Sequence, residues 1–339
     1  MSADVSQSGA PSATPPAKEQ GSSLFARFKM FLELIRFSHT IFALPFALLA
    51  AAMAWWFRFN ATSTFNVFTD DGCVSVEVPL FKVGFRWQDL LGVLLCMVFA
   101  RSAAMAFNRV VDAPFDAENP RTIRRHIPAG LVARSTVAWW TALCAIAFVA
   151  STLIFLPNRW PAILSVPFLI FICSYSLTKR FTSLAHFWLG ASLMLAPVSA
   201  WIAILGDYAF REPWPPLLLG GAVLLWVAGF DIIYSTQDAD VDRKLRLRSV
   251  PARFGIRGAL RIAAACHVGT VVLLACVPAS FAGFNLIWIA GVAAVAILLL
   301  YEHWIVSESD LTRVNAAFFN CNAIVSLGLL AVGVLDLLI

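Results

Sequence analysis

The chain has 339 residues, of which 60% are hydrophobic and only 13% are charged, and its formal net charge is +5. Ordinary soluble domains carry roughly 25% charged residues, so this composition excludes a soluble globular protein and indicates a multi-pass membrane protein. The basic residues form no patch with interleaved aromatic residues, so we expect no nucleic-acid partner. Their expected partners are the anionic head groups of membrane lipid.

The N-terminal residues 1–23 are rich in Ser, Ala, Pro, Gly and Gln and lack the apolar core of a signal peptide, which predicts a disordered cytoplasmic tail. The remaining residues, 24–339, are expected to form one membrane domain. It contains nine apolar runs that approach the roughly 20 residues a bilayer-spanning helix needs. They lie near 37–57, 88–107, 132–155, 161–177, 183–205, 215–235, 259–280, 284–304 and 317–338. The expected fold is therefore all-α, with nine transmembrane helices.

The positions of Lys and Arg predict the orientation, because cytoplasmic loops carry an excess of basic residues. With the N-terminus inside, most of the 25 basic residues fall on the cytoplasmic side. The exceptions are Arg58, Lys82, Arg86, Arg159 and Arg211. The predicted topology is N-in and C-out.

The segment 58–86 is the one long external connection in this topology. Its end, SVEVPLFKVGFRW, alternates apolar and polar residues as a short strand or hairpin does. We expect either a small cap on the outer face or a loop without catalytic importance.

A first acidic cluster, NRVVDAPFD, follows the second span. Asn108, Asp112 and Asp116 are spaced four residues apart, so on a continuous helix their side chains share one face. Pro114 is expected to end or distort that helix after Asp112. Carboxylates near hydrocarbon are costly, which makes this cluster a candidate functional site.

A second acidic cluster, QDADVD, ends the sixth span on the same side of the membrane. Asp238 and Asp242 repeat the spacing of four, with Gln237 beside them and Asp231 two turns earlier on a similar face. Mg²⁺ prefers oxygen ligands and usually binds one or two carboxylates together with substrate phosphates. Two such faces predict magnesium ions that hold a diphosphate.

Basic residues follow both clusters and supply the positive charge that a diphosphate needs. They are Arg121, Arg124, Arg125, Arg243, Lys244, Arg246 and Arg253, with Lys179 and Arg180 on the intervening cytoplasmic loop. Singly, such residues are also typical of solvated loops or of contacts with lipid phosphates. Two DxxxD motifs on one side, each followed by basic residues, favour the functional interpretation.

The two motifs resemble those of the UbiA family of intramembrane aromatic prenyltransferases. NRVVDAPFDAENPRTIRRHIPAG is similar to the family's NxxxDxxxD motif, and YSTQDADVDRKLRLRSVPARFG is similar to its YxxQDxxxD motif followed by SxPxxxG. With IRFSHTIFALPFAL in the first span, the resemblance covers nearly the whole chain. It implies nine helices around a central cavity in the inner (cytoplasmic) membrane, with cytoplasmic loops over an active site where Mg²⁺ holds a polyprenyl diphosphate.

Carried over by position, the resemblance assigns the metal site to Asn108, Asp112, Asp116, Asp238 and Asp242. Lys179 matches a position that touches the diphosphate, and Arg121 and Arg125 are further candidates for binding it.

Arg101 lies seven residues before Asn108, as does a family arginine placed to meet the carboxylate of the aromatic acceptor. An arginine inside a membrane helix is expected to face a cavity and an anion, and the spacing puts it on the Asn108 face. The alternative is that it pairs with a structural carboxylate such as Asp231.

Four further residues are candidates for substrate binding. Arg36 either contacts phosphate or snorkels to the interface. Tyr234 and Gln237 are expected to line the cavity and form hydrogen bonds. Tyr175 is either a cavity residue or an interfacial aromatic.

The implied reaction belongs to quinone biosynthesis and begins with loss of diphosphate, assisted by metal ions and basic side chains. The electron-rich ring of the acceptor then attacks C1 of the allylic cation, and a base removes the ring proton. Asp231 is a candidate for this base, and helix packing is its alternative role.

Two alternatives stay open from the sequence. The chain departs from the commonest family pattern at Arg109, Arg124 and His126. The NR variant at Arg109, the HTIFALPFA helix and the VPARFG ending are most similar to bacterial members that act on 4-hydroxybenzoate or on the dihydroxynaphthoate of the menaquinone route. A secondary transporter also fits nine helices with intramembrane charges, although transporters usually bind near the midplane and these acidic pairs lie at one face.

Overall fold

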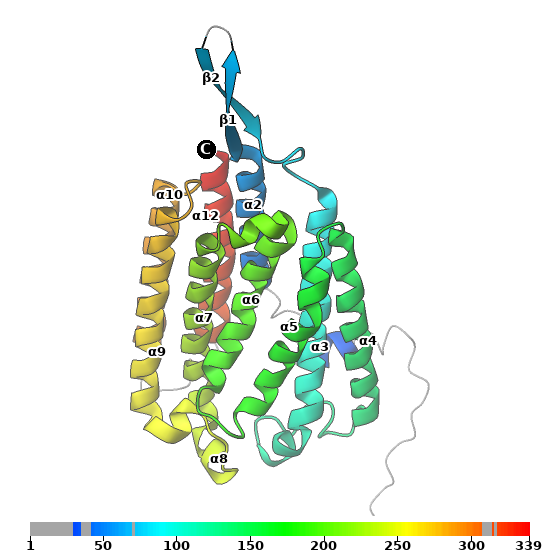
Figure 1. Cartoon of the computed structure of the whole chain (residues 1–339). Helices are drawn as coiled ribbons and strands as arrows, with labels where there is room; N and C mark the ends of the chain where they lie inside the picture. Colours follow the sequence, from blue (N-terminus) through cyan, green and yellow to red (C-terminus); the bar gives the residue numbers. More distant parts are fainter. Residues whose placement is uncertain (1–29, 35–41, 70–71, 307–313, 315–316) are drawn as a thin grey trace, which may run out of the picture.

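The computed structural model describes residues 30–34, 42–69, 72–306, 314 and 317–339, so the predicted tail 1–23 and Arg36 lie outside the described residues. Long helices run side by side and one hairpin projects from them (Figure 1). The longer elements are α2 (Leu44–Asn60), β1 (Thr62–Thr69), β2 (Gly72–Pro79), α3 (Trp87–Glu118), α4 (Arg134–Thr152), α5 (Trp160–Thr178), α6 (Ala185–Leu205), α7 (Trp214–Ser235), α8 (Ala239–Lys244), α9 (Val250–Cys276), α10 (Leu286–Ile305) and α12 (Asn322–Leu338). Short 3₁₀ turns follow several of them, at Leu153–Phe155, Gly206–Phe210, Thr236–Asp238 and Val277–Ala279, and a π-turn, Ala317–Cys321, precedes α12.

Eight helices in the described part of the chain are long and apolar enough to cross a bilayer. They coincide with the predicted spans from 88–107 onward, which confirms a helical, multi-pass membrane protein. The first predicted span, 37–57, overlaps α2, an apolar helix of 17 residues. Because residues 35–41 lie outside the described part, the count of nine stays a prediction.

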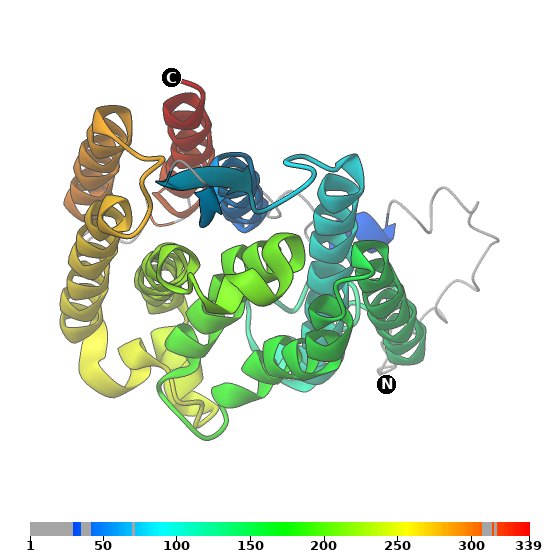
Figure 2. The ribbon, with the colours of Figure 1, turned by 45° about the horizontal axis from the view of Figure 1, so that its top comes forward.

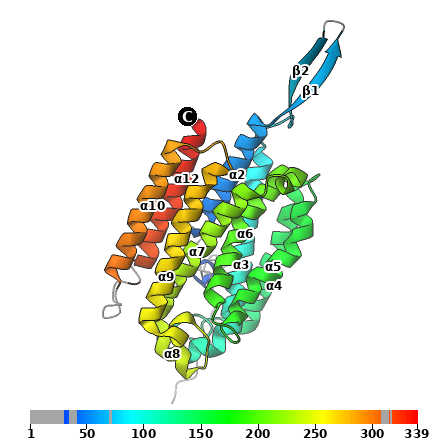
Figure 3. The same cartoon turned by 60° about the vertical axis from the view of Figure 1, so that its left-hand side comes forward.

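The insertion 58–86 contains the expected strands. β1 and β2 pair antiparallel, from Thr62 opposite Pro79 to Thr69 opposite Gly72. The hairpin extends away from the helix ends, at the end of the bundle opposite α8 (Figures 1 and 3). It therefore projects from the bundle, and it lies far from the acidic motif at α8.

Pro114 does not end the second span, which corrects one of the two outcomes expected for it. α3 is a single 32-residue helix that contains Pro114 and continues to Glu118. Proline removes one backbone hydrogen bond, but the last turn has other support, because the Thr122 hydroxyl donates to the Asp116 carbonyl at 3.0 Å. Asp116 therefore stays on the helix that carries Asn108.

Exposed tryptophans mark both ends of the bundle. Trp87 and Trp214 begin α3 and α7 at the hairpin end, and Trp304 and Trp139 lie at the opposite end of α10 and near the start of α4. Tryptophan is enriched at the two water interfaces of a bilayer, where its ring is apolar and its N–H is polar. The two groups of tryptophans therefore mark the expected positions of the two water interfaces, at opposite ends of the long helices.

The chain bends where it returns from the acidic motif to the membrane. The Ser249 hydroxyl caps the start of α9 by accepting from the Ala252 N–H at 3.3 Å. Gly255 then leaves the helical conformation, with φ at 72°. Glycine adopts this left-handed region without a Cβ penalty. The segment before the bend stays near α8, and the span begins after it, close to the predicted start at residue 259.

α6 and α7 form the centre of the bundle, between α9 and α10 on one side and α3 and α4 on the other (Figure 2). Between helices in lipid, stability comes from close packing rather than from removing apolar surface from water. Gly190 permits this approach, because a Cβ at that position would collide with the carbonyl oxygen of Leu224 on α7. Fully buried Trp201 of α6 and Trp226 of α7 pack against Phe57 and Phe46 of α2.

Replacing Gly190 by alanine is expected to destabilise the bundle, because α6 and α7 must separate to accept the methyl group. Overpacking of this kind costs about 1–3 kcal/mol, which a fall in the apparent melting temperature of the detergent-solubilised protein would report. Gly328→Ala on α12 is the matched control, because a Cβ there meets no atom within 4 Å. Equal melting temperatures for the two variants would contradict this account of the α6–α7 contact.

Candidate functional site

Charged side chains gather in a cavity of about 300 Å³ at the α8 end of the bundle. Both acidic motifs face it, one from the last turns of α3 and one from the segment around α8. The ionisable residues that line it are Asp112, Asp116, Asp231, Asp238, Asp242, Arg101, Arg109, Arg121, Arg125, Tyr175, Lys179, Arg180 and Tyr234. The structure thus brings together the two clusters that lie far apart in the sequence.

The first motif uses the shared helix face that its spacing predicts. Asn108 Nδ2 donates to Asp112 Oδ2 at 2.6 Å, across one turn of α3, and lies 3.3 Å from Ser176 Oγ on α5. One turn later, both carboxylate oxygens of Asp116 accept from Arg125 Nη1, at 2.7 and 2.8 Å. Arg125, in the loop that follows α3, therefore pairs with the motif at the end of α3.

The second motif is tied to the same loop. Arg121 Nε donates to Asp238 Oδ1 at 2.8 Å, and its Nη2 donates to the other oxygen. Asn119 Nδ2 also donates to Asp238 at 3.1 Å, and Arg121 Nη1 donates to the Tyr234 hydroxyl at 3.0 Å. Burial alone would lower the pKa of Arg121, but the hydrogen bonds and charge of Asp238 raise it above its usual value. This bidentate pair joins the two halves of the chain across the cavity.

Lys179 contributes a positive charge to the lining of the cavity. Its Nζ lies 3.7 Å from Asp242 Oδ2. Burial alone would lower the pKa of Lys179, but the carboxylates of Asp242, Asp231, Asp238 and Asp112 together raise it. The amine is therefore charged at neutral pH and available to a phosphate.

The oxygen-bearing side chains of the cavity fit a cation that takes part of its coordination shell from water or substrate. Among the described residues, no three His, Cys, Asp or Glu side chains gather closely enough to hold a metal by themselves. Mg²⁺ usually takes one or two carboxylates and completes its shell with water and substrate phosphate. Asp242 Oδ2 is buried and has no hydrogen-bond partner within the described ranges, and all the predicted ligand atoms are oxygens. These features fit Mg²⁺ bound together with a diphosphate.

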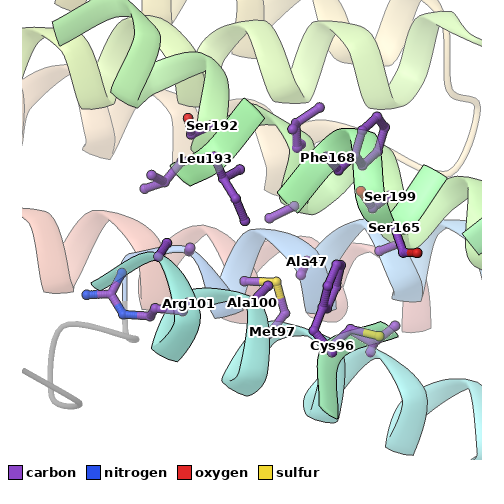
Figure 4. Close-up of a pocket in the computed structure, with 18 of the residues that line it drawn as sticks. Ala47, Cys96, Met97, Ala100, Arg101, Ser165, Phe168, Ser192, Leu193 and Ser199 are labelled. Carbon is purple, nitrogen blue, oxygen red and sulfur yellow. The ribbon is translucent and has the colours of Figure 1, made fainter. Parts of the chain in front are cut away.

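A second, apolar cavity of about 180 Å³ adjoins the polar one. Figure 4 shows Met97 and Ala100 of α3 facing Leu193 of α6 and Phe168 of α5, with Arg101 at one end. Five side chains line both cavities: Arg101, Met105, Tyr175, Leu189 and Leu193. We call these five residues the neck. The polar cavity therefore adjoins, at the neck, an apolar space between the helices.

Arg101 is the one arginine of the neck, and within the described part of the chain no hydrogen bond or ion pair joins it to Asp231. That carboxylate contacts His186 Nδ1 at 2.6 Å instead. Arg101 Nε is buried without a hydrogen-bond partner in the described part of the chain. A guanidinium in this state is stabilised by an anion that enters the cavity. The geometry thus favours the ligand-binding role for Arg101 over the structural alternative.

Comparison with known proteins decides the family. The model of the UbiA prenyltransferase family matches residues 81–324, which include both acidic motifs and the neck. The chain belongs to this family. A 4-hydroxybenzoate octaprenyltransferase of Alkalilimnicola ehrlichii is 31% identical over 245 residues, 71% of this chain and 79% of the relative.

Two solved UbiA structures are similar over most of their length. The apo structure of a UbiA homolog from Aeropyrum pernix has a TM-score of 0.72 and 29% identity, and the match covers 89% of this chain and 98% of that one. A UbiA homolog from Archaeoglobus fulgidus, bound to GPP and Mg²⁺, has a TM-score of 0.62 and 17% identity, with 91% and 100% covered. The second likeness shows the fold alone. The family resemblance of the two motifs is confirmed.

Not every predicted residue reaches the UbiA cavity. Tyr175 and Tyr234 line it, but Gln237 does not, because its amide donates to the Tyr234 carbonyl at 3.3 Å and lies away from the lining. The expectation for Gln237 came from its place in the YxxQDxxxD motif. The residue lies in the 3₁₀ turn Thr236–Asp238 that follows α7.

Three residues in contact with the UbiA motifs were not predicted. Asn119 precedes the predicted loop arginines, and Ser176 lies between Tyr175 and Lys179, so both belong to stretches that the sequence already marked. His186 is a single histidine at the start of an apolar span, and no spacing connects it to Asp231. Only the packing of α6 against α7 brings these two together.

Proposed function

We propose that this protein transfers a polyprenyl group from a polyprenyl diphosphate to an aromatic acid, 4-hydroxybenzoate or a close relative of it, in quinone biosynthesis. One observation carries the proposal: a polar cavity lined by two Asp motifs and basic side chains adjoins an apolar cavity, and the two share a neck that contains Arg101. A polyprenyl diphosphate likewise has a charged head, the diphosphate, and an apolar tail, the prenyl chain. Membership of the UbiA family and the name of the Alkalilimnicola relative support the reaction and the acceptor class.

The metal site is proposed to consist of Asn108, Asp112, Asp116, Asp238 and Asp242, together with oxygens of the diphosphate. Mg²⁺ bound there supplies neutralising charge for the departing diphosphate. The Archaeoglobus homolog, solved with GPP and Mg²⁺, supports the choice of metal.

The basic side chains are proposed to bind the diphosphate directly. Arg125 and Arg121 neutralise Asp116 and Asp238 in this structure. Because arginine matches the geometry of phosphate as well as that of carboxylate, both side chains can turn to phosphate oxygens once the carboxylates have another cation. Lys179, charged and half-buried in the cavity, stabilises the negative charge that develops on the leaving oxygen.

The acceptor is proposed to lie at the neck, with its carboxylate on Arg101. Met105, Leu189 and Leu193 surround this position with apolar surface, which excludes water from the allylic cation. Asp231 lines the polar cavity next to the neck. It is proposed to take the ring proton after the acceptor ring has bonded to C1 of the prenyl chain.

We also propose that α2 belongs to a ninth span, and that the α8 end faces the cytoplasm from the inner membrane. The excess of basic residues at the α8 end supports this orientation. The C-terminus lies at the hairpin end, opposite α8 (Figures 1 and 3), which is consistent with an N-in, C-out chain of nine helices.

The first experiment is a membrane assay with Mg²⁺, a radiolabelled polyprenyl diphosphate and two acceptors in parallel, 4-hydroxybenzoate and dihydroxynaphthoate. We expect prenylated product from 4-hydroxybenzoate. Product from dihydroxynaphthoate alone would transfer the assignment to the menaquinone route. Absence of product from both would contradict the proposal and bring back the transporter alternative, against which the position of the charges at one end of the bundle argues.

Asp112→Ala and Asp238→Ala are each expected to lower the rate of transfer by at least about 100-fold, because each removes charge that holds the leaving group. The control is Asp240→Ala in the same segment: that carboxylate is 85% exposed and pairs with Arg243. Its rate should equal that of the wild type. Transfer at the wild-type rate in either of the first two variants would rule out the metal and diphosphate assignment.

Mg²⁺ with inorganic diphosphate is expected to raise the apparent melting temperature of the wild-type protein, because a ligand that binds the folded state stabilises it. Asp242→Asn should lose most of this gain, since the neutral amide is a poorer ligand for Mg²⁺. EDTA should stop turnover. A melting temperature that does not respond to the two ligands, or activity that survives EDTA, would contradict the metal site.

Arg101→Ala is expected to raise KM for the aromatic acid by roughly 10- to 100-fold, the range for loss of a charge-assisted hydrogen bond. KM for the prenyl diphosphate should change much less. Steady-state kinetics with each substrate varied in turn would measure both values. Equal increases would remove the acceptor-binding role of Arg101.

A further inference from the structure

Asp231 differs from the other carboxylates of the polar cavity in the residue that faces it. Asp116, Asp238 and Asp242 lie beside Arg125, Arg121 and Lys179, respectively, and Asp112 lies 3.7 Å from Arg180. Asp231 instead contacts the imidazole of His186, with 2.6 Å between Oδ2 and Nδ1. Its charge is therefore not neutralised by a guanidinium or an ammonium in direct contact within the described part of the chain.

The hydrogen bonds of His186 determine its tautomer. The backbone N–H of Val250 donates to His186 Nε2 at 3.3 Å. A neutral imidazole has one donor and one acceptor nitrogen, so the proton lies on Nδ1 and points at Asp231. The imidazole is thus fixed at both nitrogens, between α7 and the first residue of α9, and its side chain is completely buried.

The position of His186 on α6 connects it to the neck. His186, Leu189 and Leu193 are spaced three and four residues apart, so they share one face of the helix. Leu189 and Leu193 line both cavities. Asp231, held by His186 from behind, keeps 23% of its side chain exposed, toward the polar cavity. Its other oxygen, Oδ1, accepts no hydrogen bond from the residues that the structure describes.

We infer that His186 is a positioning residue for proton removal: its Nδ1–H holds Asp231 Oδ2, so that Oδ1 faces the acceptor ring as the base. This inference rests on the proposed function. After the ring carbon has bonded to C1 of the prenyl chain, the C–H bond at that carbon breaks. Its electron pair restores the aromatic ring, and the proton goes to Asp231 Oδ1. His186 neither gains nor loses a proton.

The test compares His186→Phe with His186→Asn, using 4-hydroxybenzoate deuterated at the ring position that is prenylated. His186→Phe removes the donor and should lower kcat by roughly 10- to 100-fold, the range for loss of a hydrogen bond that orients a functional group. KM for both substrates should change little. The kinetic isotope effect should rise above that of the wild type, because proton removal becomes slower. In His186→Asn the amide nitrogen replaces Nδ1 and should restore much of kcat.

A buried histidine elsewhere supplies the control. His267 on α9 is as inaccessible as His186 and lies outside the polar cavity, so His267→Phe should leave kcat and the isotope effect unchanged. A wild-type isotope effect in His186→Phe would overturn the inference. The inference would also be overturned if both His186 variants lost rate and melting temperature equally while the isotope effect stayed unchanged. That result would indicate that His186 acts by packing alone.

A measurement without turnover separates this inference from the proposed function. ¹⁵N NMR of histidine-labelled protein in detergent should show His186 as the neutral Nδ1–H tautomer, with its Nδ1 resonance shifted by Asp231→Asn. An Nε2–H tautomer, or no response to that substitution, would overturn the positioning role. Absence of prenyl transfer in the wild type would instead contradict the proposed function.

Discussion

An ionised group inside a membrane bundle is stable only when an opposite charge or a polar ligand faces it. This constraint explains the α8 end of the protein, where carboxylates and basic side chains alternate around one cavity. Arg121 and Asp238 come from opposite halves of the chain, and their bidentate contact holds the loop after α3 against the end of α7. Without that contact, the second acidic motif would leave an uncompensated charge close to the apolar interior.

The same constraint identifies the groups that await a ligand. Arg101 Nε has no protein partner among the described residues, Asp242 Oδ2 accepts no hydrogen bond there, and Asp231 faces a neutral imidazole. These three exceptions lie around the cavity at different depths, from the neck to α8. In the proposed reaction, Mg²⁺ and the diphosphate of the prenyl donor would meet Asp242, the carboxylate of the aromatic acceptor would meet Arg101, and Asp231 would take the ring proton of the acceptor. The two reactants and the metal would then complete the charge balance of the site.

The framework that holds these groups is stabilised by contacts of another kind. Helix packing in lipid depends on close approach, and Gly190 on α6 gives that approach against α7. The approach matters for chemistry because α6 carries His186 and two residues of the neck, and α7 carries Asp231. A shift between these two helices would move the proposed base relative to the acceptor. Packing in the middle of the bundle therefore has consequences at its end.

The sequence by itself determined the membrane class, eight of the predicted spans and the family. It also predicted that Asn108, Asp112 and Asp116 share one face of α3, because hydropathy and a spacing of four are local properties of a helix. It did not show that Gln237 lies outside the lining of the polar cavity. Whether α3 continues past Pro114 depended on a contact from Thr122. Only the tertiary structure decided which basic residue meets which carboxylate, and that His186 lies behind Asp231. Those pairings depend on the distance between helices, which no periodicity along one chain segment encodes.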